Sequence, residues 1–321
     1  MKLIAPDYYS SFSCIAGKCR NSCCIGWEID IDEYTAEYYR TLSGDLGIKL
    51  KNSIAEGPSG SSFILSEEER CPFLNREGLC DIILQLGEDS LCQICSDHPR
   101  FRNYFSDRTE IGLGLCCESA AHLILTKKEK THLTMICDDK CGEALSKSDA
   151  DALEMRDKLI EIAQQREIGI LSRIKKILFC FASETTSACI PASRMLTLEQ
   201  LNSSWTDRLL RLNEYEKGNK QLDLSEFDQI FRQYATVFEQ FLVYLLFRHF
   251  PDAVQSERQR EYLLFIVSSV ILTARMLKVS CSAANNFSCV EELTDIIREW
   301  SAEIEYSDEN IEKLLFFFED K

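Results

Sequence analysis

Residues 14–27 read CIAGKCRNSCCIGW, which places four cysteines within eleven residues, followed by Gly26 and Trp27. Zinc and iron–sulfur clusters both accept thiolate ligands, and short irregular spacings let a backbone wrap around one metal. The alternative is that these residues are buried, reduced cysteines that pack as small apolar side chains. The adjacent Cys23 and Cys24 point in different directions, so they can serve different sites. The stretch therefore indicates metal ligation.

A second group of cysteines follows between residues 71 and 117. Cys71 begins the segment CPFL and Cys80 lies nine residues later, while Cys92 and Cys95 form a Cys-x2-Cys pair. The pair at 116 and 117 completes the group. Together the two groups hold ten thiols, which is more than one four-ligand site can use.

Composition and charge limit the class of protein. With 321 residues and 45% hydrophobic residues, the chain can bury a substantial core, as one large domain or two ordinary ones. Its net charge of −16 disfavours nucleic acid and is compatible with lysine-rich partners. Its longest apolar runs, 241–247 and 263–272, are too short for a membrane helix, and residues 1–9 do not form a secretory signal. We expect a cytoplasmic protein with no membrane partner, whose thiols stay reduced.

The pattern of elements predicts a mainly α protein in two parts. A polar stretch at 142–150 separates an irregular Cys-rich metal or iron–sulfur module, residues 1–145, from an all-α helical domain, residues 146–321. In the helical domain, apolar periodicity predicts helices over 152–181, 196–212, 227–250, 257–278, 289–304 and 308–318, with Pro251 ending the third. In the module we expect helices over 32–42 and 118–125 and strands over 61–65, 71–74 and 79–83, the last two forming a small β-hairpin.

Several cofactor motifs are missing from the sequence. There is no Cys-x3-Cys-x2-Cys triplet of the radical S-adenosylmethionine type and no ferredoxin spacing. Neither a Walker A sequence nor a complete Gly-x-Gly-x-x-Gly turn occurs. A conventional nucleotide site on a doubly wound sheet is therefore unsupported.

Taken together, the ordered motifs resemble the flagellin lysine-N-methylase (FliB-type) family. The resemblance covers residues 1 to about 125 and is weaker at 238–251. The motifs that carry it are Phe12-x-Cys14-x4-Cys19-x3-Cys23-Cys24-x-Gly26-Trp27, Cys71-Pro72-Phe73-Leu74, Gly78-Leu79-Cys80-Asp81-Ile82, Leu86-Gly87-Glu88, Cys95-x3-Pro99-Arg100 and Cys117-x2-Ala120-Ala121.

This resemblance implies a bacterial cytoplasmic enzyme that methylates lysines of flagellin, with S-adenosylmethionine as methyl donor. It also implies a cysteine-held iron–sulfur cluster, which we expect to be 4Fe–4S, with zinc as the alternative metal. Cys92 and Cys116 would be spare thiols. The metal ligands carried over from the family are Cys14, Cys19, Cys23, Cys24, Cys71, Cys80, Cys95 and Cys117.

Methyl transfer also requires a base, because the lysine ammonium has a pKa near 10.4 and must lose its proton before it attacks. The acidic candidates near the cysteines are Glu28, Asp30, Asp32 and Glu118. Glu118 departs from the family pattern, in which Pro-Glu follows the last cysteine, whereas this chain has Glu118-Ser119. Arg100 can meet a substrate carboxylate or form a salt bridge within the protein.

Two other classes of function stay open on the sequence alone. One is a non-catalytic, zinc-stabilised module that binds another protein, and the other is an iron–sulfur electron-transfer or sensor protein. Metal content and colour distinguish the methylase from the zinc-stabilised module. Binding of the methyl donor distinguishes it from the electron-transfer or sensor protein. The sequence leaves the oligomeric state open.

Overall fold

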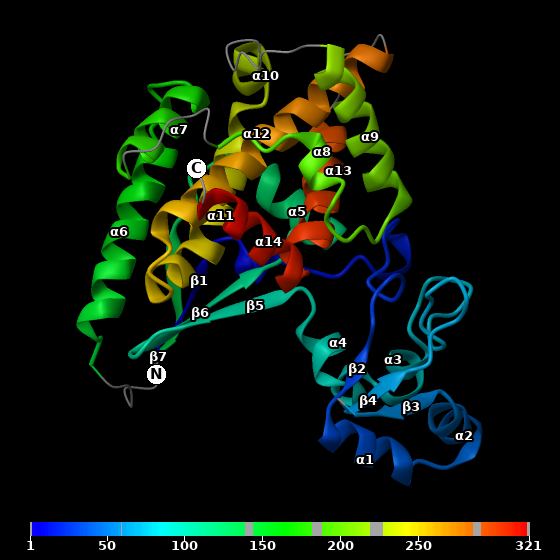
Figure 1. The fold of residues 1–321 in the computed structure, drawn as a ribbon. Coiled ribbons are helices and arrows are strands. Elements are labelled where there is room, and N and C mark those ends of the chain that lie inside the picture. Colours follow the sequence, from blue (N-terminus) through cyan, green and yellow to red (C-terminus); the bar gives the residue numbers. More distant parts are fainter. Residues whose placement is uncertain are drawn as a thin grey trace. The chain divides into compact units, whose positions relative to one another are not determined.

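The computed structural model describes residues 2–58, 60–138, 144–181, 188–218, 227–284 and 290–319, with the side chains of 282–284 left out. The chain forms two compact units (Figure 1). The cysteine-rich unit comprises Ser13–Phe101 with Cys117–Ser119. The helical unit comprises Met1–Phe12, Arg102–Cys116 and Ala120–Lys321.

These units differ from the division drawn at 145/146 from the sequence. The N-terminal strand β1 (Lys2–Pro6) pairs with β6 (Arg108–Leu113) and β7 (Leu133–Asp138). This pairing places all three strands in the same unit as the helices. The compact cysteine-rich unit therefore lies entirely within the predicted module, residues 1–145, but covers only part of it.

Helices dominate the helical unit, which confirms the mainly α prediction. In chain order they are α5 (Glu118–Leu125), α6 (Lys147–Ala163), α7 (Ile170–Phe179), α8 (Ala192–Met195), α9 (Ser203–Gly218), α10 (Asp228–Gln233), α11 (Ala235–Gln255), α12 (Gln259–Ala284), α13 (Val290–Trp300) and α14 (Asp308–Glu319). A π-helix, Ser301–Glu305, joins the last two. Short 3-10 turns occur at Tyr9–Ser11, Ala16–Lys18 and Glu88–Ser90 elsewhere in the chain.

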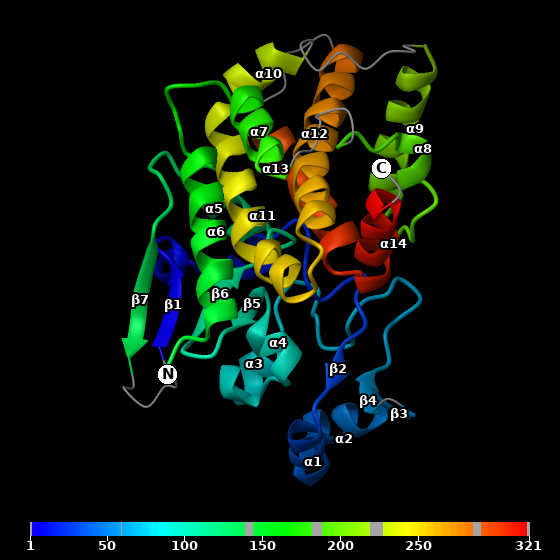
Figure 2. The same cartoon turned by 60° about the vertical axis from the view of Figure 1, so that its left-hand side comes forward.

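The centre of the helical unit is the pair α11 and α12, which lie side by side in Figures 1 and 2. Helix α6 packs on α11, and α13 and α14 pack on α12. The segment Gln259–Cys281 of α12 is long and apolar enough to cross a membrane by length and composition. However, 83% of its apolar window is buried inside the protein, so its apolar side chains serve the core.

Helix α11 continues through Pro251, where the sequence predicted its end. Proline has no N–H, so the carbonyl of Phe247 four residues earlier loses its helical donor. The side-chain amide of Asn103 donates to that carbonyl oxygen at 2.9 Å. A replacement donor from outside the helix therefore satisfies the group that the proline leaves unpaired.

A four-stranded sheet, in the order β5–β6–β1–β7, belongs mainly to the helical unit and was not predicted. Strand β5 (Arg100–Tyr104) begins at the boundary of the two units. β1 runs parallel to β6 and antiparallel to β7, with a shift of register between Leu3 and Ile4. Lys2 pairs with Arg108 more than one hundred residues away, so no local pattern announces the pairing.

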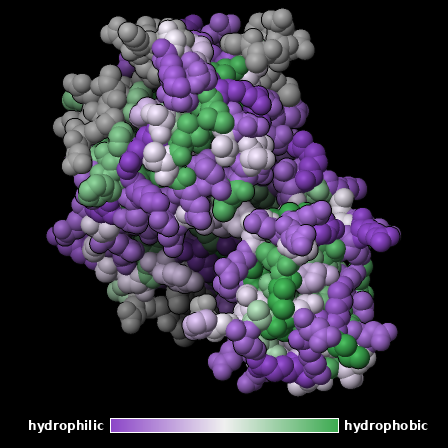
Figure 3. Space-filling view, turned by 45° about the vertical axis from the view of Figure 1, so that its right-hand side comes forward, coloured by the Kyte–Doolittle hydropathy of each residue, from purple (hydrophilic) through white to green (hydrophobic). Residues whose placement is uncertain are grey.

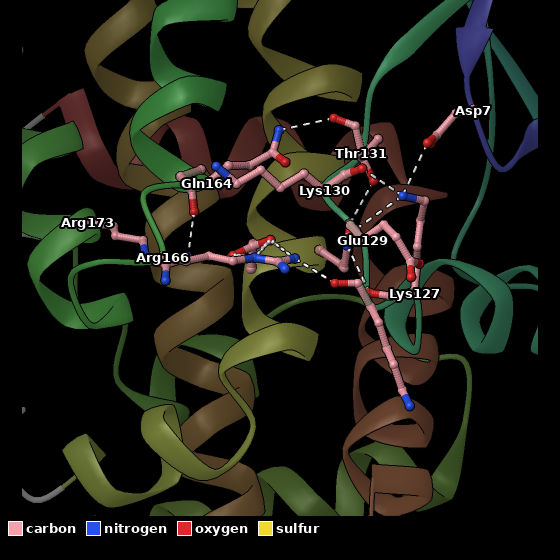
Figure 4. Close-up of polar contacts among 12 residues, drawn as sticks. Asp7, Lys127, Glu129, Lys130, Thr131, Gln164, Arg166 and Arg173 are labelled. Atoms are coloured by element: carbon pink, nitrogen blue, oxygen red, sulfur yellow. Dashed lines mark hydrogen bonds and ion pairs between the residues drawn. The ribbon is translucent and has the colours of Figure 1, made fainter.

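Polar contacts fix the loop between α5 and β7 to the helices (Figure 4). Arg166 bonds the carboxylate of Glu239 on α11 and also donates to the carbonyl oxygen of Lys128. Arg173 donates to the same carboxylate at 2.7 Å, and Gln164 donates to the carbonyl of Thr131. Glu239 is buried, and the guanidinium groups of Arg166 and Arg173 stabilise its negative charge.

The cysteine-rich unit is built from short elements. Its three-stranded antiparallel sheet has the order β2 (Asp30–Ile31), β4 (Gly60–Phe63), β3 (Ile54–Gly57). Its helices are α1 (Glu33–Thr41), α2 (Gly44–Asn52), α3 (Asp81–Leu86) and α4 (Gln93–Asp97). Figure 3 shows hydrophobic atoms among hydrophilic ones at the surface, and the exposed apolar side chains of this unit include Tyr34, Ile48, Ile64 and Leu84. The unit thus leaves several large apolar residues outside its core.

The β-hairpin predicted from the strands 71–74 and 79–83 is wrong. Only one isolated β-bridge of it is present. Leu74 and Cys80 form an isolated antiparallel bridge, but the chain then turns into helix α3 at Asp81. The Asn75 side chain accepts hydrogen bonds from the backbone N–H groups of Glu77 and Leu79, which closes the turn locally. A short apolar run cannot distinguish a strand from a helix, and this one forms a helix.

Candidate functional site

Nine cysteines of the described chain lie in the cysteine-rich unit, and they include all eight predicted ligands. The ninth is Cys92, which the sequence analysis treated as a spare thiol. Cys116 belongs to the helical unit, where it is buried and hydrogen-bonds Tyr306. Cys141 and Cys289 lie outside the described residues.

Five of the nine cysteines pack in or against the hydrophobic core of the unit, which contains Ile29, Tyr39, Phe63 and Phe73. We call them the core thiol set: Cys24, Cys71, Cys80, Cys92 and Cys95. Their sulfurs influence one another electrostatically, since Cys71 and Cys80 both interact with Cys24, and Cys95 interacts with Cys24 and Cys71. The set therefore gathers thiols from three separate segments.

The other four cysteines are absent from that core. We call them the surface thiol set: Cys14, Cys19, Cys23 and Cys117. Cys14 and Cys23 are exposed, and Cys19 and Cys117 are half-buried. Cys23 interacts with Cys14 and Cys117, and Cys19 interacts with Cys117. Residues 14–23 and residue 117 are thus brought together from the two ends of the unit's sequence.

Pairs of thiols hydrogen-bond within this arrangement. Cys23 donates to Cys24, which lowers the pKa of Cys24 to about 7 and raises that of Cys23. Cys95 donates to Cys92 in the same way, so the pKa of Cys92 falls below its ordinary value while that of Cys95 rises. Each pair can thus share one proton, with the negative charge on one sulfur.

Burial raises the pKa of other thiols in the unit. It raises the pKa of Cys71 to about 12, and neighbouring Cys24 and Cys80 add to the rise. The pKa of Cys19 rises to about 11, chiefly through burial, with Glu118 and Cys117 also contributing. Thiolates crowded in this way repel one another, and a bound cation would relieve the repulsion.

Backbone contacts hold the segments that carry these cysteines. The N–H of Cys71 donates to the carbonyl of Cys24 at 2.8 Å, and that of Gly26 donates to the carbonyl of Glu69 at 3.0 Å. Arg70 donates to the carbonyls of Leu74 and Asn75. The scaffold therefore ties residues 24–26 to residues 69–75 independently of any metal.

The donor set fits a thiolate-binding metal, because zinc and iron–sulfur clusters are held by cysteine sulfur. Within the ranges that the structure describes, no three Cys, His, Asp or Glu side chains stand close enough to hold one metal ion. The two thiol sets are thus defined by their neighbours and burial, and the ligand roles of the eight cysteines stay a prediction.

The structure does not gather the predicted catalytic residues around one point. Glu28 and Asp30 are exposed, Asp30 on strand β2. Arg100 is half-buried and donates to the carbonyl of Ser96.

Glu118, another predicted base, is held by hydrogen bonds from Arg20. Its carboxylate accepts hydrogen bonds from the backbone N–H of Arg20 at 2.8 Å and from Arg20 Nε at 2.9 Å. The Cys19 sulfur lies 3.6 Å from the same carboxylate. Partial burial would raise the pKa of Glu118, but the bonds from Arg20 outweigh it and hold the pKa below its usual value. A carboxylate with a lowered pKa is a weak base, so Glu118 is better suited to position Cys19 beside Cys117.

Asp32, a further predicted base, caps helix α1. Its carboxylate accepts from the backbone N–H of Thr35 at 3.0 Å and from that of Gln93 at 2.9 Å. We expect Asp32→Ala to lower the free energy of unfolding by about 1 kcal/mol, the usual cost of losing an N-cap. Urea unfolding measures this change, with Asp30→Ala as the control because Asp30 is exposed on the adjacent strand. Equal midpoints for the two variants would contradict the capping role.

Some residues of this site were missed by sequence reasoning. Gly17 lies between Cys14 and Cys19, and a Cβ there would come within 2.6 Å of the Glu77 carbonyl oxygen. Gly78 has a φ of +73° and faces the Cα of Gly17. The composition of Asn75-Arg76-Glu77-Gly78 is typical of a turn. Its close contact with Gly17 joins segments far apart in the sequence, so no local pattern could have predicted it.

Comparison with curated proteins identifies relatives for part of the chain. It is 29% identical to a lysine-N-methylase of Salmonella typhimurium over 137 residues, which are 40% of this chain and 34% of that protein. A lysine-N-methylase of Salmonella choleraesuis matches equally. The match thus spans about a third of the length of these methylases.

A shorter relative is matched over most of its length. The chain is 30% identical over 128 residues to the flagellar biosynthetic protein FliU of Salmonella muenchen, which covers 37% of this chain and 75% of FliU. No family model matches the sequence, and no solved structure matches it. The similarity to FliU and to the two methylases shows that this chain belongs to the flagellin lysine methylase (FliB-type) family.

Proposed function

We propose that this protein is a cytoplasmic lysine N-methyltransferase that acts on flagellin with S-adenosylmethionine as methyl donor. We propose further that its cysteine-rich unit holds an iron–sulfur cluster, of the 4Fe–4S type. The observation that carries the proposal is the similarity to proteins named lysine-N-methylase and to FliU. The nine thiols collected in one unit support the cluster.

The reaction requires a neutral lysine nitrogen. The side chain must lose a proton, because its ordinary pKa is near 10.4. The nitrogen lone pair then forms a bond to the methyl carbon of the sulfonium donor, while the carbon–sulfur bond breaks and its electrons stay on sulfur. Glu28 and Asp30 stay the predicted acceptors of the proton, since Glu118 and Asp32 are engaged elsewhere.

The charge of the chain suits such a substrate. A net charge of −16 attracts cationic side chains and raises the rate of encounter with a lysine-bearing protein. The effect weakens as salt is added, because exposed charges are screened within about 10 Å at 0.1 M ionic strength. Methylation of flagellin should therefore slow at high salt.

A bound metal would also stabilise the unit that holds it. The cysteine-rich unit has short strands and leaves several apolar side chains exposed, so its hydrophobic core is small. Small cores are commonly supplemented by metals or disulfides. A cluster held by these thiolates would supply iron that can exchange electrons, and it would link distant segments of the unit covalently.

The test is anaerobic purification followed by measurement of iron, acid-labile sulfide, zinc and methyl transfer from labelled S-adenosylmethionine to flagellin. About four irons and four sulfides per cluster, with broad absorption near 400 nm, support the cluster. Colourless protein with stoichiometric zinc and no transfer would instead identify a zinc-stabilised interaction module. A reducible cluster without donor binding would indicate electron transfer or sensing.

Cys95→Ala provides the matched mutation. Cys95 belongs to the core thiol set, so we expect this variant to lose iron and at least tenfold of its methyl-transfer activity. Cys180→Ala is the control, because Cys180 is exposed at the end of α7 in the other unit. Wild-type activity in Cys95→Ala would refute a role for this cysteine in the enzyme.

A further inference from the structure

We propose that helix α1 of the cysteine-rich unit is a docking surface for flagellin, and that its exposed side binds a lysine-bearing, cationic segment of that protein. This inference rests on the proposed function, which names flagellin as the substrate. It adds the place where the substrate is held and the side chains that hold it. These side chains, which we call the α1 face, are Glu33, Tyr34, Glu37 and Tyr38.

Helix α1, labelled in Figures 1 and 2, has one buried and one exposed side. Thr35, Ala36 and Tyr39 are buried, and the Tyr39 hydroxyl donates to the carbonyl of Ser90 at 2.7 Å. All four residues of the α1 face are exposed. Because residues three and four positions apart are neighbours on a helix, their side chains form one continuous surface.

Two side chains of the α1 face are aromatic. Tyr34 is 83% exposed and Tyr38 is 37% exposed, and the two lie one helical turn apart. The ring of Tyr38 packs against that of Tyr39, with 5.9 Å between the ring centroids, which holds it in place. Tyrosine is enriched at protein interfaces, and the face of its ring attracts ammonium groups. The pair therefore suits a partner that carries lysine.

The two carboxylates of the α1 face have no cation to neutralise them. Neither Glu33 nor Glu37 forms an ion pair in the part of the chain that the structure describes. Arg40 lies one turn beyond Glu37, but it pairs with Glu56 at 2.6 Å instead. Like charges four residues apart on a helix repel each other. A cationic partner would relieve this repulsion, so the charges favour its binding.

Together these groups select one chemical class of partner. A lysine ammonium can pair with a carboxylate while it lies over a tyrosine ring, so a lysine-bearing segment can use both kinds of side chain at once. The net charge of −16 adds attraction over a longer range. Nucleic acids and acidic proteins would be repelled by the same surface.

The α1 face follows directly on a residue with a predicted role in the reaction. Strand β2 ends at Ile31 and α1 begins at Glu33. Asp30 of this strand is exposed and is a predicted acceptor of the lysine proton. A segment bound to α1 is therefore held by the same compact unit as Asp30. Since methylation keeps the charge of lysine, methylated and unmethylated flagellin should bind α1 equally.

The test measures the binding of monomeric flagellin without methyl donor, and methyl transfer with it. We expect Glu33→Lys/Glu37→Lys to weaken binding and raise the KM for flagellin about tenfold, with kcat changed less than about twofold. Tyr34→Ala should weaken binding about threefold, whereas Tyr34→Phe, which keeps the ring, should restore it.

The charge-matched control is Asp151→Lys/Glu161→Lys in helix α6 of the other unit. Both residues are exposed carboxylates, and this variant changes the net charge of the chain as much as the α1 variant does. It should bind flagellin like the wild type. Equal weakening by the two variants would mean that only the total charge matters, and would overturn the proposal.

The remaining outcomes separate this inference from the proposed function. Circular dichroism checks the fold of the α1 charge variant, because an acid such as Glu33 in the first turn favours a helix. Should that variant not fold, Tyr34→Ala decides, since Tyr34 is largely exposed. Methyl transfer with an unchanged KM in Tyr34→Ala would refute this inference alone. Binding that depends on the α1 face, without methyl transfer, would refute the proposed function alone.

Discussion

Replacing Glu305 by alanine should lower the free energy of unfolding by about 3–5 kcal/mol, the usual cost of removing one partner from a buried ion pair. Glu305 is buried at the end of the π-helix. Its carboxylate accepts hydrogen bonds from Tyr244 at 2.9 Å and from Ser301 at 2.5 Å, and bonds His249 at 2.6 Å. Arg248 stands 3.6 Å away. The substitution would leave this half-buried arginine without the carboxylate that faces it.

The lowered pKa of Glu305 also indicates that its carboxylate stabilises the folded protein. Burial alone would raise it, but the charge of Arg248 and the bonds from His249 and Ser301 outweigh burial and hold it below the usual value. The carboxylate therefore stabilises the folded state at neutral pH, and this contribution is lost as the pH falls through the lowered pKa. The acid sensitivity of the wild type should be reduced in Glu305→Ala.

The matched control for this substitution is Glu309→Ala in helix α14. Glu309 pairs with Lys313 one helical turn away, and its side chain is 68% exposed. Exposed pairs of this kind contribute little to stability, so the control should unfold close to the wild type. Urea unfolding followed by circular dichroism compares the two. Equal midpoints would mean that the network around Glu305 does not stabilise the helical unit.

The apolar period predicted where helices lie, but it predicted their ends less well. The expected helix at 118–125 agrees with α5 and that at 308–318 with α14, while the one at 152–181 divides into α6 and α7. The helix predicted to end before Pro251 continues to Gln255, because Asn103 satisfies the freed carbonyl. A donor from another part of the chain cannot be inferred from the period of apolar residues.

Strand pairing was harder to predict because it is non-local. β1 has only five residues, and its partners begin at Arg108 and Leu133. The four strands all lie within residues 1–145, which the sequence analysis had assigned to the metal module, but the sheet belongs mainly to the helical unit. The helix predicted from Asp32 is present, and Asp32 is its cap. The same residue looked like a catalytic acid only because it lies near cysteines in sequence.

The candidate site was predicted in composition but not in arrangement. Cysteine spacing drew attention to the unit in which nine of the described cysteines lie. Cys23 and Cys24 have different neighbours there, and the suggestion that they serve different sites stays a prediction. Cys116, however, lies in the helical unit although it is adjacent to Cys117. Chain proximity does not report which way a side chain packs, so Cys92 and Cys116 could not be sorted from spacing.

Replacing Gly17 by alanine should damage the segment that carries the surface thiol set. The added Cβ would lie 2.6 Å from the carbonyl oxygen of Glu77, closer than real Cβ contacts allow. The obstacle is backbone, and the turn that contains it is closed by the Asn75 side chain, so it cannot move cheaply. Overpacking of this kind costs about 1–3 kcal/mol. The segment 14–19 must therefore shift away from the turn.

This shift would displace Cys14 and Cys19 together, so Gly17→Ala should lose both stability and part of the metal that the proposed function assigns to this unit. Gly57→Ala is the matched control in the same unit, because its Cβ would meet only the Gly60 carbonyl oxygen at an ordinary 3.5 Å. Chemical unfolding and metal content per chain measure both variants. A Gly17→Ala protein as stable as the control and with full metal content would show that the approach of Gly17 to the turn does not hold the surface thiol set.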